Sequence, residues 1–220
     1  MIKITELEKK YSSDFTLKID ELYIDNGERV AIIGPNGSGK STLLKLIAGI
    51  IKPDRGSIEI TAPKSKTGYE PQNPFVFRGT VEKNVRLGVH GSDNTYEIMS
   101  ACNLVNLRDK HTSKLSGGEK QRMCFARTLA GNYELLLLDE PMSSSDIETS
   151  GMLEKVLLNQ CIQNGTTLLM STHLPSQAYN IATKVLIMNN GRISDFCDVS
   201  ELKEPKSDFG KKYIEQWRLL

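Results

Sequence analysis

Residues 34–42 read Gly34-Pro35-Asn36-Gly37-Ser38-Gly39-Lys40-Ser41-Thr42, between an apolar run at 30–33 and an apolar-periodic segment at 43–48. This order predicts a strand, a glycine-rich loop and a helix, the arrangement that cradles phosphate groups. Glycines let the main chain approach an anion, and the helix N-terminus adds its positive dipole end. Lys40 would supply charge to the β- and γ-phosphates, and Ser41 a hydroxyl to Mg²⁺. An ordinary glycine turn needs neither the Lys-Ser pair nor a helix there, so we predict a nucleoside triphosphate site.

The composition is that of a soluble globular chain. It has 220 residues, 39% hydrophobic and 25% charged, which is enough to bury an ordinary core. The formal net charge of +1 creates no whole-molecule field toward nucleic acid or anionic lipid. No apolar stretch approaches the length of a membrane span, which is about eighteen residues. The spacing of the four cysteines is typical of neither a zinc site nor a disulfide framework. We therefore expect a reduced, cytosolic protein.

The first half of the chain changes from a strand pattern to a helical one. Segments 2–4, 15–19 and 57–60 alternate apolar and polar residues, which predicts an antiparallel sheet with one exposed face. Between residues 80 and about 105 the apolar spacing becomes helical, with Ser92-Asp93 as the expected N-cap. This region is predicted to be a small helical insert.

Beyond residue 115 helices and strands alternate. The expected helices are 119–130 and about 148–160, and the expected strands are 135–138, 166–170 and 185–188. This order predicts a parallel sheet covered on both faces. Asn189-Asn190-Gly191 predicts a hairpin turn after the last of these strands. Apolar residues at 209, 213, 214 and 217 share one face of an expected final helix, which either packs on the core or docks a neighbour.

Two acidic residues follow the apolar run Leu135-Leu136-Leu137-Leu138. Burial explains the leucines but not Asp139 and Glu140 at the carboxyl end, where open parallel sheets bind their ligands. Asp139 can hold Mg²⁺ through water, while Glu140 can polarise an attacking water. The alternative is a solvated acidic turn, which the nearby glycine loop disfavours.

A second glycine-containing turn reads Leu115-Ser116-Gly117-Gly118-Glu119-Lys120-Gln121, at the start of an expected helix. Ser116 can cap this helix, and the two glycines expose main-chain N–H groups at its positive end. Capping alone requires no such pair of glycines. We interpret the turn as a surface that closes on a nucleotide held by another copy of the chain.

These motifs, spread over about residues 2–196, resemble those of the nucleotide-binding subunits of ABC transporters. Residues 34–42 are similar to that family's Walker A loop, 115–121 to its signature sequence, and 135–140 to its Walker B strand with the catalytic glutamate. The resemblance implies a single domain with the α/β P-loop NTPase fold. It places a RecA-like core and antiparallel β lobe at about 1–72 and 116–196, a helical subdomain at about 73–115 and a tail at 197–220.

Several residues take their roles from this resemblance. Gln72, after Gly68-Tyr69-Glu70-Pro71, resembles the glutamine that touches Mg²⁺ and the attacking water, and that senses the membrane partner. His173 resembles the switch histidine that contacts the γ-phosphate. Tyr11 stands where an aromatic side chain would stack on adenine.

Other positions concern partners. Ser143-Ser144-Ser145-Asp146 occupies the D-loop position, where the family usually has Ser-Ala-Leu-Asp, and Met142 replaces a usual threonine. Phe75 and Phe77 either belong to the core of the helical insert or line the groove that receives a coupling helix of the membrane subunit.

The resemblance implies a transporter ATPase that uses ATP and Mg²⁺. Tyr11 and residues 34–42 would bind the nucleotide, Ser41, Gln72 and Asp139 the metal, and Lys40, Gln72, Glu140 and His173 would act in catalysis. Residues Leu115, Ser116, Gly117, Gly118, Glu119 and Gln121 would contact the ATP of a second cassette, identical or paralogous, with Asp146 near the dimer contact. The compact chain and the short stretch between Gln72 and Ser116 resemble small importer cassettes, so we expect an importer. The expected partners are transmembrane permease subunits and a substrate-binding protein. The chain would lie on the inner face of the cell membrane.

Two other classes share the glycine loop. A soluble cassette ATPase acting on nucleic acid or ribosomes is the main alternative, but the stretch between Gln72 and Leu115 has no room for a long coiled coil or zinc module. A GTPase or nucleoside kinase would have no use for residues 115–121, and the chain has no Asn-Lys-x-Asp guanine-recognition motif. The nature of the cargo does not follow from this chain.

Overall fold

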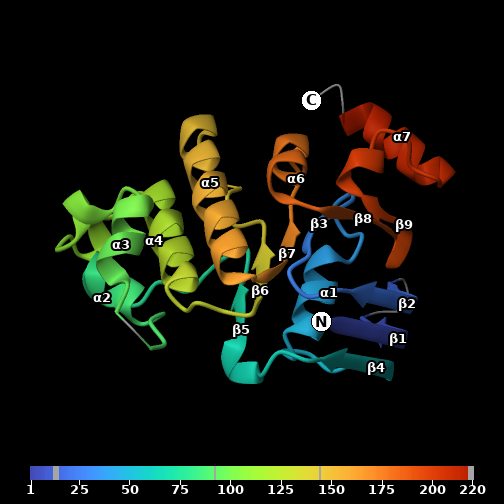
Figure 1. Ribbon diagram of the computed structural model, residues 1–220, viewed down its shortest axis with the longest axis horizontal. Coiled ribbons are helices and arrows are strands. Elements are labelled where there is room, and N and C mark those ends of the chain that lie inside the picture. The colour runs from blue at the N-terminus through green and yellow to red at the C-terminus, as the bar shows by residue number, and fades with distance from the viewer. Residues whose placement is uncertain (12–14, 92, 144, 218–220) are drawn as a thin grey trace.

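Two sheets organise the protein. The computed structural model describes residues 1–11, 15–91, 93–143 and 145–217. The antiparallel sheet has the order β2-β1-β4 and the larger sheet the order β5-β6-β7-β3-β8-β9 (Figure 1). The strands are β1 Ile2–Lys10, β2 Thr16–Ile24, β3 Arg29–Ile33, β4 Arg55–Ile60, β5 Thr67–Glu70, β6 Leu135–Asp139, β7 Thr167–Ser171, β8 Lys184–Asn189 and β9 Arg192–Asp198.

Helices connect and cover these strands. The α-helices are α1 Lys40–Ile47, α2 Val81–Arg86, α3 Thr95–Ala101, α4 Gly117–Leu129, α5 Ile147–Asn164, α6 Pro175–Ile181 and α7 Asp208–Trp217. Short 3₁₀ turns lie at Lys64–Lys66, Val105–Leu107, Thr112–Lys114 and Val199–Glu201. None of the helices in the described part of the chain is both long and apolar enough to span a bilayer.

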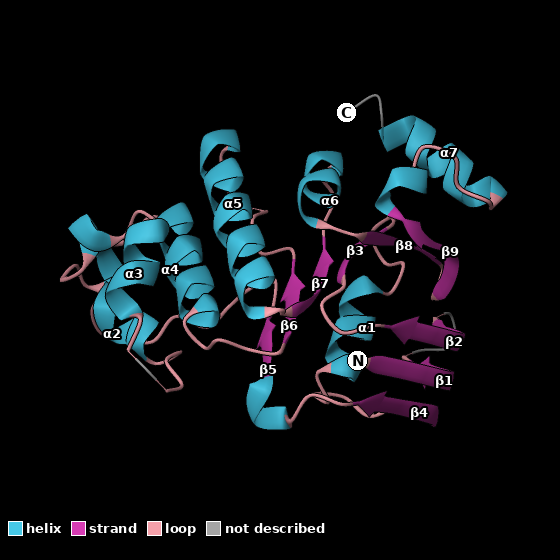
Figure 2. Ribbon diagram, viewed as in Figure 1, coloured by secondary structure: helices cyan, strands magenta, loops and turns pink. Residues whose placement is uncertain are grey.

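The leucine run of β6 explains why the larger sheet is covered on both faces. Successive side chains of a strand point to opposite faces. Leu135 and Leu137 accordingly pack with α1 and the antiparallel sheet, whereas Leu136 and Leu138 pack with residues of α4 and α5. All four leucines are at most 4% exposed. The predicted parallel sheet with helices on both faces and an antiparallel β lobe is confirmed (Figure 2).

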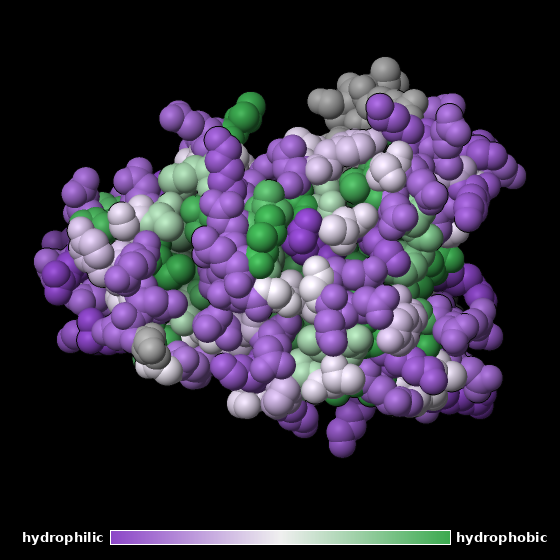
Figure 3. Space-filling model, viewed as in Figure 1, coloured by the Kyte–Doolittle hydropathy of each residue, from purple (hydrophilic) through white to green (hydrophobic). Residues whose placement is uncertain are grey.

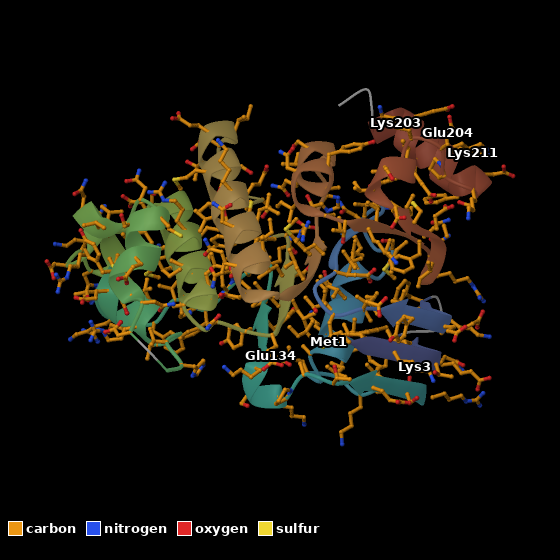
Figure 4. The ribbon with its side chains drawn as sticks, in the orientation of Figure 1. Met1, Lys3, Glu134, Lys203, Glu204 and Lys211 are labelled. Carbon is orange, nitrogen blue, oxygen red and sulfur yellow. The ribbon has the colours of Figure 1, made fainter. Side chains whose placement is uncertain are left out.

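The last elements form a third packing cluster. Ile33 of β3 and Ile187 of β8 lie in it with Ile214 of α7, and Phe209 and Tyr213 pack against it. This confirms core packing for the expected face of the last helix at these three positions. The hairpin prediction is also confirmed, because Asn190 and Gly191 both have positive φ between the antiparallel strands β8 and β9. Figure 4 labels Lys203, Glu204 and Lys211 on this C-terminal segment, apart from Met1 and from Lys3 of β1.

The helical insert differs from its prediction at the start of α3. The N-cap of α3 is Asn94 rather than Ser92-Asp93; Ser92 lies outside the described residues, and the Asp93 carboxylate accepts a hydrogen bond from the Thr95 N–H instead. In addition, α4 packs against α2 and α3, and Figure 1 shows these three helices together at one end of the molecule. The division of the chain at residue 115 therefore stays a prediction.

Glu70, the last residue of β5, is a buried carboxyl group. It is 2% exposed. Its side chain points to the opposite face of β5 from Tyr69, which packs against the apolar residues of α1 and the antiparallel sheet. Burial raises the pKa of Glu70 to about 7, although the Thr128 hydroxyl and the Arg127 charge act in the opposite direction. The folded chain therefore holds this proton at pH values where the unfolded chain has released it.

We expect Glu70→Gln to change the pH dependence of stability. The folded pKa lies near 7 and the ordinary value is 4.5, so the wild type loses stability relative to the variant as the pH rises from about 4.5 to about 7. The total relative loss is about 3 kcal/mol. Urea unfolding between pH 4 and pH 8 measures it. Glu21→Gln, at an exposed position, is the control. Parallel profiles for wild type and Glu70→Gln would show that Glu70 does not titrate in this way.

Candidate nucleotide site

A cleft of about 850 Å³ lies at the carboxyl edge of the larger sheet. It brings together ten of the residues predicted from the sequence and adds Phe15. It is lined by Tyr11, Phe15, Asn36, Gly37, Gly39, Lys40, Ser41, Thr42, Gln72, Glu140 and His173. Most of these side chains are polar, and they come from five separate segments of the chain. The face of the molecule in Figure 3 is mostly hydrophilic, with scattered apolar groups.

Two glycines of the loop adopt conformations that other residues would not. Gly34 has φ +146°, and a Cβ there would lie 2.2 Å from the Met188 carbonyl oxygen, so no other residue fits. Gly39 has φ +106° and forms the N-cap of α1 without any side-chain cap hydrogen bond. The first N–H groups of α1 therefore lack a side-chain acceptor, and an anion bound at this helix end would supply one.

Lys40 is the cation of the loop. It is 6% exposed, and its Nζ donates to the carbonyl oxygens of Gly34 at 2.8 Å and Pro35 at 3.1 Å. Burial lowers the pKa of Lys40, while the charges of Glu140 and Asp139 raise it. The ammonium group therefore folds back on its own loop, within the electrostatic reach of both acids.

Asp139 ends β6 and connects three segments. Its Oδ1 accepts hydrogen bonds from Ser41 Oγ at 3.0 Å and from Ser171 Oγ at 2.7 Å. The residue is 3% exposed. The Ser41 hydroxyl and the Asp139 carboxylate are oxygen donors of the kind that Mg²⁺ prefers.

Glu140 follows in a left-handed conformation with φ +50°. Such a conformation costs a non-glycine residue about 1–3 kcal/mol and is concentrated at functional sites. Its N–H donates to Ser171 Oγ at 3.0 Å, and its Oε2 accepts from Gln72 Nε2 at 2.8 Å. Its Oε1 lies 2.5 Å from His173 Nε2. Gln72, Glu140 and His173 thus form one contacting group.

Two residues of the site, Ser171 and Phe15, have no role predicted from the sequence. Ser171 accepts from the main chain of Glu140 while it donates to Asp139, so it orients both acids. The feature that indicates this role is the position of Ser171 at the end of β7, where it pairs with Asp139 in the parallel sheet. Phe15 is predicted only as a strand residue, but its ring lies 3.2 Å from the Cβ position of Gly39. Tyr11, 53% exposed, lines the same cleft and donates its N–H to the Phe15 carbonyl.

A magnesium ion would rely on few protein ligands. Within the described ranges, no three His, Cys, Asp or Glu side chains converge on one point. Mg²⁺ usually takes one or two protein ligands together with water and substrate phosphates. Ser41 and Asp139, in direct contact, fit this pattern, and Gln72 reaches the same cleft while its amide group binds Glu140.

Residues 115–121 lie at the start of α4 and are not part of the cleft lining among the described residues. Ser116 forms a capping box with Glu119, in which Ser116 Oγ accepts from the Glu119 N–H and Glu119 accepts from the Ser116 N–H. Lys110 Nζ lies 3.1 Å from both carboxylate oxygens of Glu119. Leu115 and Gln121 are buried, whereas the Cβ position of Gly117 has no atom within 4 Å.

Asp146 caps α5. Its carboxylate accepts from the N–H and the hydroxyl of Thr149, and these bonds hold the pKa of Asp146 below its usual value. Ser145 Oγ donates to Gln121 Oε1 at 3.4 Å, so this loop contacts α4. Ser144, which belongs to the same predicted loop, lies outside the described residues.

Comparison with known proteins identifies the arrangement. The family model described as ABC transporter matches residues 17–143. A molybdate/tungstate import ATP-binding protein of Methanocaldococcus jannaschii is 36% identical over 94% of this chain and 74% of its own length. A sulfate/thiosulfate import ATP-binding protein of Synechococcus elongatus is 32% identical over 97% of this chain and 67% of its own length. Among solved structures, the dimeric ATP-binding cassette MJ0796, in a post-hydrolysis state bound to ADP and Pi, superposes with a TM-score of 0.80. The match has 24% identity and covers 90% of this chain and 99% of that chain, which shows a shared fold.

We expect Ser171→Ala to lower the affinity for Mg²⁺, so that nucleotide hydrolysis needs a higher Mg²⁺ concentration. Asp139 and the Glu140 main chain would both lose the hydroxyl that orients them. Loss of such a supporting hydrogen bond typically costs about 10- to 100-fold in metal affinity or activity. Hydrolysis rates across a Mg²⁺ titration measure the effect, and Ser171→Thr, which keeps a hydroxyl, should restore most of it. An unchanged Mg²⁺ midpoint in Ser171→Ala would contradict this role.

Proposed function

The chain belongs to the ABC transporter family, and from this premise we propose that it powers import across a membrane as one of two cassettes that close head to tail on ATP. It is an ATP-binding, ATP-hydrolysing subunit. The observation that carries the proposal is the position of Glu140, held between Gln72 and His173 in the cleft that Lys40 and Ser41 also line.

Each residue of the cleft has a role in this proposal. The glycine loop and Lys40 bind the phosphates, and Tyr11 stacks on the adenine. Ser41, Asp139 and Gln72 hold Mg²⁺, which when bound offsets the charge of the phosphates. Glu140 polarises the attacking water, and His173 contacts the γ-phosphate. General-base assistance of this kind is worth about 10²- to 10⁴-fold in rate.

The second cassette supplies the missing side of the site. Ser116, Gly117 and Gly118 start α4 outside the cleft of their own chain, and the open space at Gly117 leaves its main chain approachable. We propose that this turn covers the ATP bound by the partner cassette, with Asp146 near the contact. Closure on ATP and opening after hydrolysis would then drive the membrane subunits.

The membrane partner is proposed to dock beside Gln72. Phe75 and Phe77, 69% and 44% exposed, contact each other edge to face with ring centroids 4.8 Å apart. Arg127 donates to the Phe75 carbonyl and lies over the Phe77 ring. An exposed aromatic pair fixed in this way suits an apolar helix of a permease subunit.

Permease subunits, and in an importer a substrate-binding protein, would choose the cargo. The relatives named above are described for molybdate/tungstate and for sulfate/thiosulfate, and a further relative for spermidine/putrescine. Cassettes this similar thus serve anions and cations alike, so the cassette itself does not select. We place the chain on the inner face of the membrane. The alternative of a soluble cassette ATPase acting on nucleic acid is not favoured, because these relatives are import subunits.

We expect Glu140→Gln to leave ATP binding intact, abolish turnover and stabilise an ATP-dependent dimer, because the amide cannot accept the proton of the attacking water. Phosphate release and size-exclusion chromatography with ATP measure the two effects. Glu134→Gln is a matched control, since Glu134 is exposed and precedes β6 at its opposite end (Figure 4). Brisk hydrolysis by Glu140→Gln would refute the assigned role.

The paired mechanism also predicts how activity depends on concentration. Specific activity per chain should fall toward zero when the protein is diluted below its self-association range, because half of each site comes from the partner. Hydrolysis and mass photometry across the same dilution series test this. A strictly monomeric sample with full activity per chain would overturn the two-cassette proposal.

A further inference from the structure

A series of buried side-chain hydrogen bonds links α5 to the segment that carries His173. Gln177 of α6 is its centre, with Oε1 accepting from Thr172 Oγ1 at 2.5 Å and Nε2 donating to Ser150 Oγ at 3.1 Å. Ser150 Oγ in turn donates to Glu154 Oε1 at 3.3 Å, and Asn180 Nδ2 donates to Glu154 Oε2 at 2.8 Å. Thr172, Gln177, Ser150 and Glu154 are each at most 7% exposed. Buried polar groups in a satisfied network of this kind rigidify the structure around them.

The network ends on the main chain at both sides of His173. The Thr172 hydroxyl donates to Gln177 and at the same time accepts from the Leu174 N–H at 3.0 Å. The Thr172 N–H donates to the Ile32 carbonyl of β3. Gln177 therefore fixes the direction of a hydroxyl group that holds the residue after His173, while β3 holds the residue before it.

His173 benefits from this support because its imidazole lies at the rim of the cleft. Its side chain is 39% exposed, yet its Nε2 lies 2.5 Å from Glu140 Oε1. The following helix, α6, begins after Leu174, whose side chain provides no cap hydrogen bond. A partly exposed side chain takes much of its position from its own main chain, and the bond between Thr172 and Leu174 fixes that main chain on both sides of the histidine.

We propose that Gln177 is a positioning residue for His173, and that its bond to Ser150 ties the position of the histidine segment to α5, the helix that Asp146 caps. The inference rests on the proposed role of His173 at the γ-phosphate. Met142, the position that departs from the family pattern just before Asp146, places its sulfur 3.7 Å from Gln177 Nε2. The residues before α5 thus touch the same network, so a displacement of α5 would reach His173 through Gln177.

The test is Gln177→Leu, which keeps the approximate size of the side chain and removes its hydrogen bonds. We expect kcat for ATP hydrolysis by the full chain to fall by up to about 100-fold, since a misplacement of about 1 Å can cost that much. KM for ATP should change little, because Gln177 does not line the cleft. Thr172→Val removes the bond to Gln177 from the other end, together with the bond to the Leu174 N–H. It should show the same split and decides the question if Gln177→Leu does not fold.

Gln160→Leu is the matched control. Gln160 lies on α5, and its Nε2 donates to the Leu129 carbonyl at 2.6 Å, away from the histidine segment. A purely structural effect of losing a glutamine hydrogen bond would appear equally in both variants, as a lower thermal midpoint with kcat nearly retained. If Gln177→Leu behaves as Gln160→Leu does, the positioning role is wrong.

A double variant separates this inference from the function on which it rests. If Gln177 acts through His173, then Gln177→Leu should cause no further loss of kcat in a His173→Ala background. Losses that multiply would overturn the positioning role while leaving the role of His173 intact. Full turnover in His173→Ala alone would refute the proposed role of His173, and the inference about Gln177 with it.

Discussion

The hydrogen bonds to Asp139 are the constraint on which the site depends. Because β6, β7 and β3 are adjacent and parallel, their carboxyl ends meet at one edge, and a carboxylate buried there must find partners. Ser41 at the start of α1 and Ser171 at the end of β7 supply them. The glycine loop, the acid pair and the histidine segment are thereby held in register with the sheet. Leaving this buried carboxylate without partners would cost free energy, so its hydrogen bonds add to the strand pairing and apolar packing that already join the three segments.

The other charged groups of the site also have hydrogen-bond partners within the protein. Ser171 also accepts the Glu140 N–H, which fixes the left-handed turn that brings the Glu140 carboxylate to Gln72 and His173. Lys40 meanwhile binds the carbonyl oxygens of its own loop. Each of these groups has a protein partner that ATP and water would have to replace. Nucleotide binding therefore exchanges one set of hydrogen bonds for another. Before the nucleotide binds, these charged groups are not left without partners.

Much of this architecture follows from the sequence because its signals are local. The glycines of residues 34–42, the leucines of β6 and the Asn190-Gly191 turn each impose a conformation by their own chemistry. Ser171 cannot be singled out in this way, since a serine at the end of a strand acquires its meaning only from the register that sets it opposite Asp139. The role of Gln177 is harder still to predict from the sequence, because its partners Ser150 and Thr172 come from two other segments of the chain. The cap of α3 at Asn94 escapes prediction because neighbouring polar residues compete for one helix end.

In the proposed pair of cassettes, the turn at the start of α4 would serve the nucleotide of the other chain. A helix N-terminus attracts anions, but here Glu119 lies in the first turn and would repel a phosphate. Lys110, 3.1 Å from both Glu119 oxygens, offsets that charge, and the capping box occupies Glu119 at the rim of the turn. Gly117 remains open to approach. The turn is therefore stable without a ligand and still able to accept one, a combination that a surface needs if it is to meet a phosphate delivered by another molecule.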